Sequence, residues 1–292
     1  MKKIITVSVV ITSYNQEEFI KQALDSVFIQ KDIEFEVLFA DDHSTDNTLN
    51  IIREYASKHS KISKIIPRKK NLGMCLNMYD AYHKAKGKYI AILEGDDYWT
   101  DELKLKKQCD FLEKNSKYSG VFNHYDCLIN GKLKAHKEQN KLIANKKYEI
   151  YIKDLIKDNY IGNLSACMFR TNLIHSIDRN IFEKYFIADW LTGMIIYDKG
   201  GPLYLMPEKM SVYRIHGSSQ WSKMSKKDKL FEELKALSLY DHILNYKYDY
   251  IFKEKFFRRL DMSVIRKIKK YRRIWKILFI INIILMIFIL LK

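Results

Sequence analysis

Apolar runs of strand length alternate with helical apolar stripes through the first part of the chain. Residues 4–12 form a β-branched run that ends in a polar turn, and residues 19–28 then carry apolar side chains at spacings of three and four. The first pattern is typical of a strand buried on both faces, and the second is typical of an amphipathic helix. The succession continues with strands predicted at 35–40, 62–66, 88–93 and 118–123, and with helices predicted at 49–56, at 74–86 and from Thr100 onward. This alternation predicts an α/β domain with a largely parallel sheet.

Local signals predict where some of these helices begin and end. Ser44 or Asp46 is placed to cap the helix at 49–56, and Gly87 is placed to end the helix at 74–86 as its C′ residue. Asp101 and Glu102 suit the first turn of the helix expected from Thr100, because acidic side chains stabilise a helix N-terminus.

The second half of the chain is less regular. Between residues 130 and 159 the apolar pattern weakens and lysines accumulate, without a Pro or Gly cluster that would mark a linker. Farther on, we predict short strands at 167–169, 203–206 and 210–214, a helix at 189–197, and helical segments within 227–260.

Composition indicates a folded protein. Hydrophobic residues make up 47% of the 292 residues and aromatic residues 13%, whereas disordered chains are poor in both. Four cysteines without a CxxC pair favour reduced thiols in a cytosolic setting. No signal peptide is expected, because the first strand follows Met1 almost directly.

The net charge of +16 is concentrated near the C-terminus. Residues 222–292 hold 18 Lys and Arg against 7 Asp and Glu, a net charge of +11, which leaves +5 for residues 1–221. Six basic residues fall within 266–273, and residues 274–291 are then apolar except for Lys276 and Asn282. Eighteen helical residues span about 27 Å, at the short end of what a bilayer core requires. We expect this tail to associate with a membrane, either spanning it or lying in its interface, while a buried or amphipathic terminal helix is the alternative.

Polar and acidic side chains follow several of the predicted strands. In a parallel α/β sheet, ligands bind outside the carboxyl ends of the strands. Carboxylates that converge there repel one another unless a cation lies between them, so a divalent metal with oxygen ligands, able to hold a diphosphate, is the economical explanation. Ordinary loop and helix-cap roles stay open for each residue. The side chains concerned are Thr12, Tyr14, Asn15, Asp41, Asp42, Asp96 and Asp97.

Four motifs in order resemble the family 2 glycosyltransferases of the GT-A fold. They are VSVVITSYNQEEFIKQALDSVFIQ, the loop Ala40-Asp41-Asp42-His43-Ser44-Thr45-Asp46-Asn47-Thr48, the segment Asn71-Leu72-Gly73, and Leu93-Glu94-Gly95-Asp96-Asp97-Tyr98-Trp99. The resemblance covers about residues 4–222. It implies a Rossmann-like nucleotide-sugar-binding sheet with helices on both faces, to which this chain adds the C-terminal helical, membrane-associating tail.

The resemblance also implies a role for particular residues. Asp189 matches the catalytic base, which removes a proton from the acceptor hydroxyl as that hydroxyl attacks the anomeric carbon in one inverting displacement. A helix N-cap is the other interpretation of Asp189, and the two are compatible. The remaining matches are Thr12, Tyr14 and Asp42 to the nucleotide base, Asp96 to the ribose, and Asp97 to Mg²⁺ or Mn²⁺ bound to the diphosphate.

The segment from Tyr213 to Ser222 resembles the family's closing YRxH…WS element. Arg214 and His216 are its candidates for diphosphate contacts, with a structural His beside a packed Trp as the alternative. Two departures from the family pattern stand out: Glu94 occupies a position that is often Asp, and no QxxRW signature is present. The second departure, together with the single apolar segment, argues against a processive polysaccharide synthase.

These observations predict three regions: a GT-A domain at 1–222, a helical extension at 223–265, and the basic and apolar segment at 266–292. The expected activity is the metal-dependent, inverting transfer of one sugar, with a UDP-sugar favoured as donor, to a glycan or lipid-linked acceptor at the cytoplasmic face of the bacterial cell membrane. A nucleotidyltransferase is the alternative enzyme, although residues 13–18 lack the Gly-rich, basic loop such enzymes use. A polyanion-binding protein is suggested by charge alone, and nucleic acid is not an expected partner.

Overall fold

The computed structural model describes residues 6–184, 188–217 and 224–260. The chain divides into two compact units, residues 1–224 and residues 225–292. The site residues predicted from the sequence, from Thr12 to His216, all lie in the first unit.

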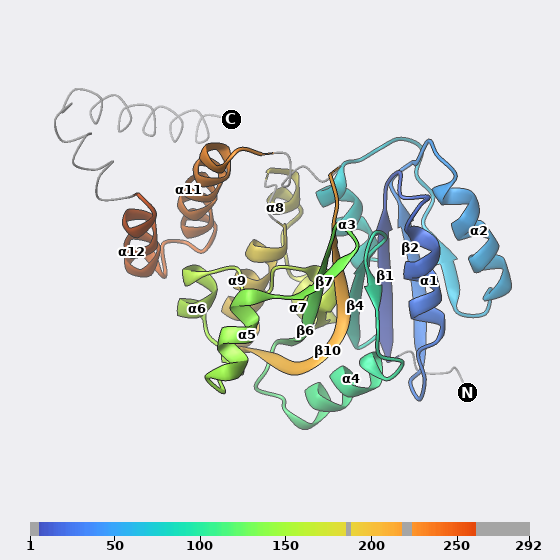
Figure 1. The fold of residues 1–292 in the computed structure, drawn as a ribbon, viewed down its shortest axis with the longest axis horizontal. Coiled ribbons are helices and arrows are strands. Elements are labelled where there is room, and N and C mark those ends of the chain that lie inside the picture. Colours follow the sequence, from blue (N-terminus) through green and yellow to red (C-terminus); the bar gives the residue numbers. More distant parts are fainter. Residues whose placement is uncertain (1–5, 185–187, 218–223, 261–292) are drawn as a thin grey trace. The chain divides into compact units, whose positions relative to one another are not determined.

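A mixed sheet forms the centre of the first unit (Figure 1). Its parallel half consists of β1 (Val7–Ser13), β2 (Phe35–Asp41), β3 (Ser63–Ile65) and β4 (Tyr89–Glu94). The strand order is β3-β2-β1-β4-β9-β6-β10-β5, with β7 beside β6 and β8 beside β10. The other strands are β5 (Tyr98–Trp99), β6 (Gly120–Ile129), β7 (Lys132–Ala135), β8 (Glu149–Ile150), β9 (Cys167–Arg170) and β10 (Leu203–Ile215).

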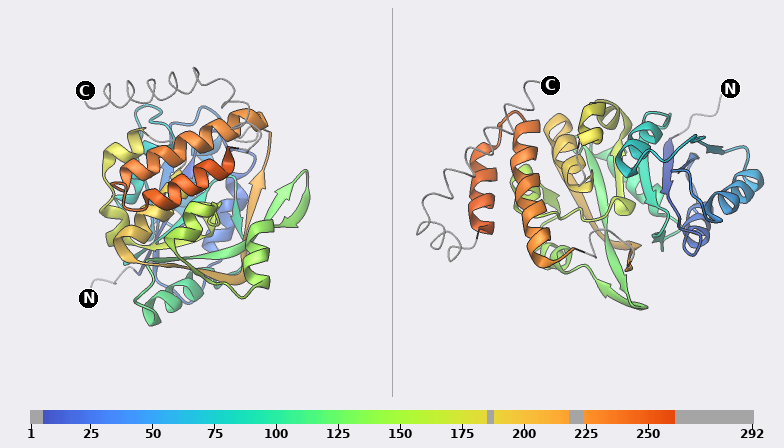
Figure 2. Two further views of the ribbon diagram at one scale, coloured as in Figure 1. Left: turned by 90° about the vertical axis from the view of Figure 1, so that its left-hand side faces the viewer. Right: turned by 90° about the horizontal axis from the view of Figure 1, so that it is seen from above.

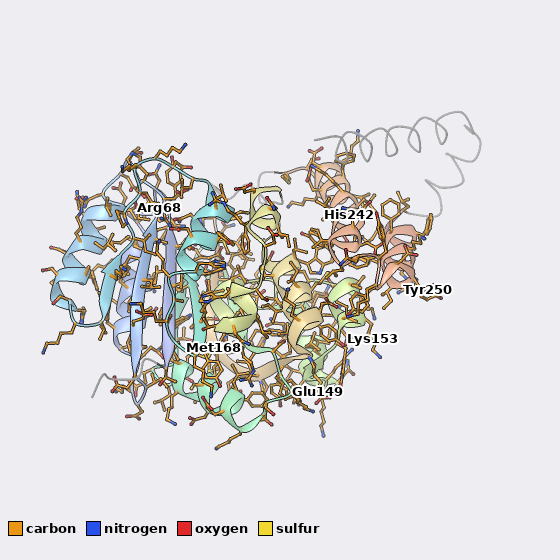
Figure 3. The ribbon with its side chains drawn as sticks, turned by 180° about the vertical axis from the view of Figure 1, so that it is seen from behind. Arg68, Glu149, Lys153, Met168, His242 and Tyr250 are labelled. Carbon is orange, nitrogen blue, oxygen red and sulfur yellow. The ribbon has the colours of Figure 1, made fainter. Side chains whose placement is uncertain are left out.

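The predicted parallel sheet is therefore correct for only part of the molecule. β9 enters between β4 and β6 and is antiparallel to both, which places the buried Met168 near the centre of the sheet (Figure 3). β10 runs parallel to β6 but antiparallel to the short strands β5 and β8. An antiparallel insertion of this kind is common in large mixed sheets.

Helices pack on both faces of the sheet, as Figures 1 and 2 show. On one face, α1 (Ile20–Phe28), α2 (Thr48–Lys58) and α4 (Lys104–Lys114) share an apolar core with alternate residues of β1 and β2. α3 (Met74–Tyr82) also packs against β1 and β2. α7 (Thr171–His175), α8 (Arg179–Lys184) and α9 (Ala188–Gly200) follow β9 along the chain. The α/β prediction, with helices on both faces, is confirmed.

Several predicted helix boundaries are wrong. α3 ends at Tyr82 and not at Lys86, so Gly87 is not its C′ residue. Instead, Gly87 lies against β1, where an added Cβ would stand 2.5 Å from the backbone nitrogen of Ser8. The helix expected from Thr100 begins at Lys104, because Tyr98 and Trp99 pair with β10 as a strand. The N-cap of α2 is Asn47, although Asp46 Oδ1 accepts a hydrogen bond from the Thr48 backbone at 2.9 Å.

The lysine-rich stretch 130–159 contains short elements that the sequence did not predict. α5 (Lys137–Ala144) and α6 (Ile152–Lys157) lie there together with β7 and β8. The two strands expected at 203–206 and 210–214 are one strand, β10, with irregular register between Met206 and Ser211. Short elements held by neighbours in space leave little periodic signal.

The second unit contains the helices α11 (Lys226–Ile243) and α12 (Asp249–Arg259). Ser225 caps α11 by accepting a hydrogen bond from the Asp228 backbone, and Glu233 of α11 pairs with Arg259 and Lys255 of α12. Over the ranges that the structure describes, no helix is both long and apolar enough to cross a membrane. The predicted membrane-associating segment at 266–292 lies outside the described residues.

Candidate active site

Four carboxyl groups gather at one edge of the sheet. Glu94 ends β4, Asp96 and Asp97 follow it in a turn, and Asp189 lies in the first turn of α9. Burial raises the pKa of Glu94 well above its usual range, and the nearby charges of Asp97, Asp96 and Asp189 raise it further. Thus residues nearly a hundred positions apart along the chain share one electrostatic environment.

Asp97 is fully buried and accepts three hydrogen bonds. Its Oδ2 accepts from Asn163 Nδ2 at 2.8 Å and from Ser165 Oγ at 2.7 Å, while Oδ1 accepts from the Arg214 backbone N–H at 2.8 Å. Burial, followed by the charge of Asp96, raises the pKa of Asp97 to about 7, although the three donors oppose that shift. The fold therefore supplies hydrogen bonds to this carboxylate but too little positive charge to neutralise it.

Asp96 forms an ion pair with His216. His216 Nε2 lies 2.9 Å from Asp96 Oδ2, and this contact raises the pKa of the imidazole. Arg214 is fixed beside the pair, because its Nε donates to the Asp96 carbonyl at 2.8 Å and its Nη2 donates to Gln22 Oε1 at 2.6 Å. The guanidinium also lies 4.8 Å from the ring centroid of Phe19. The two predicted diphosphate-contacting residues are thus together at the site, and Trp221 of the alternative interpretation lies outside the described residues.

Asp189 is oriented by a residue from a distant loop. Asn159 Nδ2 donates to Asp189 Oδ2 at 2.7 Å, while Asn159 Oδ1 accepts from the Gly162 backbone N–H at 3.1 Å. Gly162 has a φ of 60°, and an added Cβ there would stand 2.4 Å from the Tyr125 hydroxyl. Burial raises the pKa of Asp189 even though the Asn159 hydrogen bond lowers it. Asp189 lies in the first turn of α9, and the Asn159 side chain adds a tertiary hydrogen bond to the backbone hydrogen bonds that its carboxylate accepts there.

The predicted nucleotide-binding residues lie at the ends of β1 and β2. Thr12 is nearly buried and is the register partner of Glu94, whereas the Tyr14 ring is 47% exposed and open to stacking. Asp42 is buried, and its two carboxylate oxygens accept from the backbone N–H groups of Leu72 at 2.8 Å and Gly73 at 2.9 Å. Burial is the main cause that raises the pKa of Asp42.

Other polar residues of this half of the site have structural roles. Asp41 accepts from Ser13 Oγ and from the Ser44 backbone, and Asn15 Oδ1 accepts from the Thr45 backbone at 2.8 Å. These bonds hold the loop after β2 against the turn after β1. Arg68, labelled in Figure 3, pairs with Asp80 of α3, and its charge lowers the pKa of Asp42.

The structure also brings in residues that sequence reasoning missed. Asn159, Asn163 and Ser165 hold the two central aspartates, and Gln22 holds Arg214. In the sequence, these residues could have been found from the run Asn159-Tyr160-Ile161-Gly162-Asn163-Leu164-Ser165. Small amide and hydroxyl residues there lie among apolar ones without the period of a helix or a strand. Such polar residues, buried in the fold, need hydrogen-bond partners.

The metal prediction rests on Asp97 alone. Among the residues that the structure describes, no three His, Cys, Asp or Glu side chains form a ready set of metal ligands.

The mixed α/β fold is of the GT-A type, and comparison with known proteins shows the family to which the chain belongs. Residues 8–184 match the family model described as glycosyl transferase family 2. The uncharacterized protein Rv1520 of Mycobacterium tuberculosis is 34% identical over 215 residues, which cover 73% of this chain and 60% of that protein. This chain belongs to glycosyl transferase family 2. It spans about 60% of the length of its mycobacterial relatives.

Further similarities extend over most of the chain. The putative teichuronic acid biosynthesis glycosyltransferase TuaG of Bacillus subtilis is 27% identical over 236 residues, covering 79% of this chain and 89% of TuaG. The crystal structure of S. aureus TarS 1–349 in complex with UDP-GlcNAc superposes with a TM-score of 0.66 at 21% identity, covering 88% of this chain and 72% of that one. The mannosyltransferase PcManGT of Pyrobaculum calidifontis, solved with GDP-Man and Mn²⁺, gives a TM-score of 0.62 at 15% identity over 88% and 70% of the chains. The GT-A fold prediction is confirmed.

Proposed function

We propose that this chain is a metal-dependent inverting glycosyltransferase that moves one sugar from a nucleotide diphosphate sugar, with a UDP-sugar favoured, to a hydroxyl group of a glycan or lipid-linked acceptor. The observation that carries the proposal is Asp189, a carboxylate with a raised pKa that Asn159 orients and that, like Asp97, raises the pKa of Glu94. A displacement at an anomeric carbon requires a base for the acceptor hydroxyl and a carboxylate that binds the metal ion of the diphosphate, and both would lie in this site. Membership of glycosyl transferase family 2 supports the reaction class.

Asp189 acts as the general base. Its carboxylate accepts the proton of the acceptor hydroxyl while that oxygen forms a bond to the anomeric carbon and the bond to the diphosphate breaks, so the configuration inverts. Burial makes the ionised carboxylate a stronger base than an exposed Asp, because its pKa is raised. Asn159 keeps the carboxylate in one orientation and favours its ionised form.

Asp97 fits one ligand position of Mg²⁺ or Mn²⁺. A carboxylate offers about four lone-pair sites, and the hydrogen bonds from Asn163, Ser165 and Arg214 occupy three of them. Mg²⁺ is usually held by one or two carboxylates together with substrate phosphates, which agrees with a single protein ligand. A bound divalent ion would supply positive charge to the departing diphosphate.

The donor would be bound by the residues on either side of Asp97. Arg214 and His216 supply positive charge next to Asp96, and the ion pair with Asp96 keeps His216 protonated to a higher pH. Asp96 would meet the ribose, and the exposed Tyr14 ring would stack on the base beside Thr12 and Asp42. The complex of TarS with UDP-GlcNAc supports a UDP-sugar as donor.

The acceptor is proposed to belong to cell-surface polysaccharide, lipopolysaccharide or glycoprotein-glycan synthesis. The name of TuaG, a putative teichuronic acid biosynthesis glycosyltransferase, supports this class. The basic and apolar segment 266–292 would hold the enzyme at the cytoplasmic face of the membrane, close to a lipid-linked acceptor. Deleting residues 262–292 should reduce membrane partitioning and transfer to lipid-linked acceptors, and unchanged values of both would remove this part of the proposal.

A panel of nucleotide sugars tests the reaction. Release of nucleoside diphosphate would be measured with Mn²⁺ or Mg²⁺ for the wild type, Asp97→Ala and Asp189→Asn. We expect Asp97→Ala to lose donor turnover and metal dependence, and Asp189→Asn to bind donor but lose transfer. Metal-dependent turnover that survives Asp97→Ala would refute the metal assignment, and full transfer by Asp189→Asn would refute the base.

A further inference from the structure

A buried lysine is linked to the carboxylate site through hydrogen-bonded neighbours and takes no part in the chemistry proposed above. Lys104, the first residue of α4, has 0% exposure, and burial lowers the pKa of its ammonium group to about 7. Its Nζ donates to Gln108 Oε1 at 2.8 Å and lies 4.4 Å from the centroid of the Trp99 ring. Over the described ranges no carboxylate forms an ion pair with Lys104. The nearby Asp101 pairs with Lys107 instead. A buried lysine with a neutral partner costs stability, so its presence calls for an explanation.

Both neighbours of Lys104 hold the short helix η1 (Leu164–Ala166). Gln108 Nε2 donates to the Ala166 carbonyl at 2.9 Å, and Trp99 Nε1 donates to the Ser165 carbonyl at 2.8 Å. Gln108 is fully buried and Trp99 is 2% exposed, so water does not compete for these bonds. In its ammonium form Lys104 can only donate, so it selects Gln108 Oε1 and leaves Nε2 for Ala166, which fixes the orientation of the Gln108 amide.

η1 in turn holds the catalytic edge of the sheet. Ser165 Oγ donates to Asp97 Oδ2 at 2.7 Å and accepts from the Glu94 backbone N–H at 3.0 Å. The Ser165 backbone N–H donates to Asn163 Oδ1 at 2.6 Å, and Asn163 Nδ2 donates to the same oxygen of Asp97 at 2.8 Å. Every polar group of Ser165 is therefore engaged, and a displacement of its backbone would move two of the three donors to Asp97.

We propose that Lys104, acting through Gln108 and beside Trp99, is a positioning residue that fixes η1 and thereby the Asp97 carboxylate for the metal-bound diphosphate. The proposal rests on the proposed role of Asp97. Hydrogen-bonding partners behind a metal ligand commonly change metal affinity or activity about 10- to 100-fold when they are removed. Proteins commonly tolerate a lower stability at residues that serve a functional site, and the buried Lys104 fits this pattern.

Two variants of the full chain and one control test this role. Lys104→Met removes the ammonium group and keeps an apolar side chain of similar length. Gln108→Glu keeps an acceptor for Lys104 but removes the donor to Ala166. Lys106→Met is the matched control, because Lys106 lies on the same helix with a 37% exposed side chain and pairs with Asp110 on the surface. Mn²⁺ affinity would be measured in the presence of UDP from the electron paramagnetic resonance of free Mn²⁺, together with hydrogen exchange of residues 163–167 and the melting temperature.

The expected result is Mn²⁺ binding weakened about 10-fold and faster exchange at residues 163–167 in both Lys104→Met and Gln108→Glu. The melting temperature of Lys104→Met should be unchanged or higher, and Lys106→Met should match the wild type. Unchanged exchange at 163–167, or faster exchange throughout the chain with a lower melting temperature, would overturn the proposal. If the wild type binds no Mn²⁺, the metal role of Asp97 fails, whereas the effect of Lys104 on η1 is still decided by hydrogen exchange.

Discussion

Replacing Asn159 by Ala should weaken catalysis mainly at low pH. The change removes the donor that lies 2.7 Å from Asp189 Oδ2 and the acceptor of the Gly162 N–H. A hydrogen bond to a charged group contributes about 1.5 to 3 kcal/mol. If that energy is lost from the ionised base, kcat/KM falls about 10- to 150-fold.

The sign of the pH effect follows from the same contact. Burial raises the pKa of Asp189, and the Asn159 hydrogen bond lowers it by stabilising the ionised form. Without Asn159 the pKa of Asp189 rises further, so the base becomes protonated at a higher pH. The acidic limb of the kcat/KM profile should therefore move to higher pH, and the loss of activity should be greater at pH 6 than at pH 8.5.

The assay is nucleoside diphosphate release with saturating acceptor, recorded from pH 5.5 to 9 for wild type, Asn159→Ala and a control. Asn145→Ala is a suitable control, because Asn145 is exposed and its side chain donates to the Lys141 carbonyl within its own helix turn. An acidic limb that stays in place, or a loss of activity that is equal at every pH, would refute the role of Asn159 in tuning the base.

Three further results are expected. His216→Asn should raise the KM for donor several-fold. Because Asp96 raises the pKa of His216, the wild type should be more stable than this variant in thermal melts below the ordinary pKa of histidine, and this difference should fade as the pH rises through the raised pKa. A stability difference that grows with pH would contradict the ion pair. Gly162→Ala should lower the free energy of unfolding by about 1 to 3 kcal/mol in urea titrations, since Ala is strained at a φ of 60° and its Cβ would meet the Tyr125 hydroxyl; an unchanged midpoint would show that the backbone adapts. Asp42→Asn should lower the free energy of unfolding by about 1 to 3 kcal/mol, because the amide nitrogen of Asn cannot accept the second of the two backbone hydrogen bonds. The same variant should bind UDP more weakly in calorimetry, and undiminished binding would show that Asp42 does not contact the nucleotide.

The N-terminal half of the fold was predictable from local patterns. β1, α1, β2 and α2 each carry a periodic apolar signal long enough to distinguish strand from helix, and they occur within a few residues of the expected places. The boundaries that failed were set by contacts between segments distant in the chain. Tyr98 and Trp99 form a strand because β10, more than a hundred residues later, pairs with them, and that pairing delays the start of α4.

The sequence by itself determined which chemical groups stand at the ends of the strands. Asp42, Asp96 and Asp97 follow buried apolar runs, and the order of the motifs was sufficient to predict the family and the GT-A fold. Only the tertiary structure decided what holds those groups. Asn159, Asn163 and Ser165 come from a segment without periodicity, and they reach Asp97 and Asp189 because β9 enters the sheet between β4 and β6 and carries η1 with it. Hydrogen-bond partners of buried carboxylates are chosen by distance in space, which a one-dimensional pattern does not record.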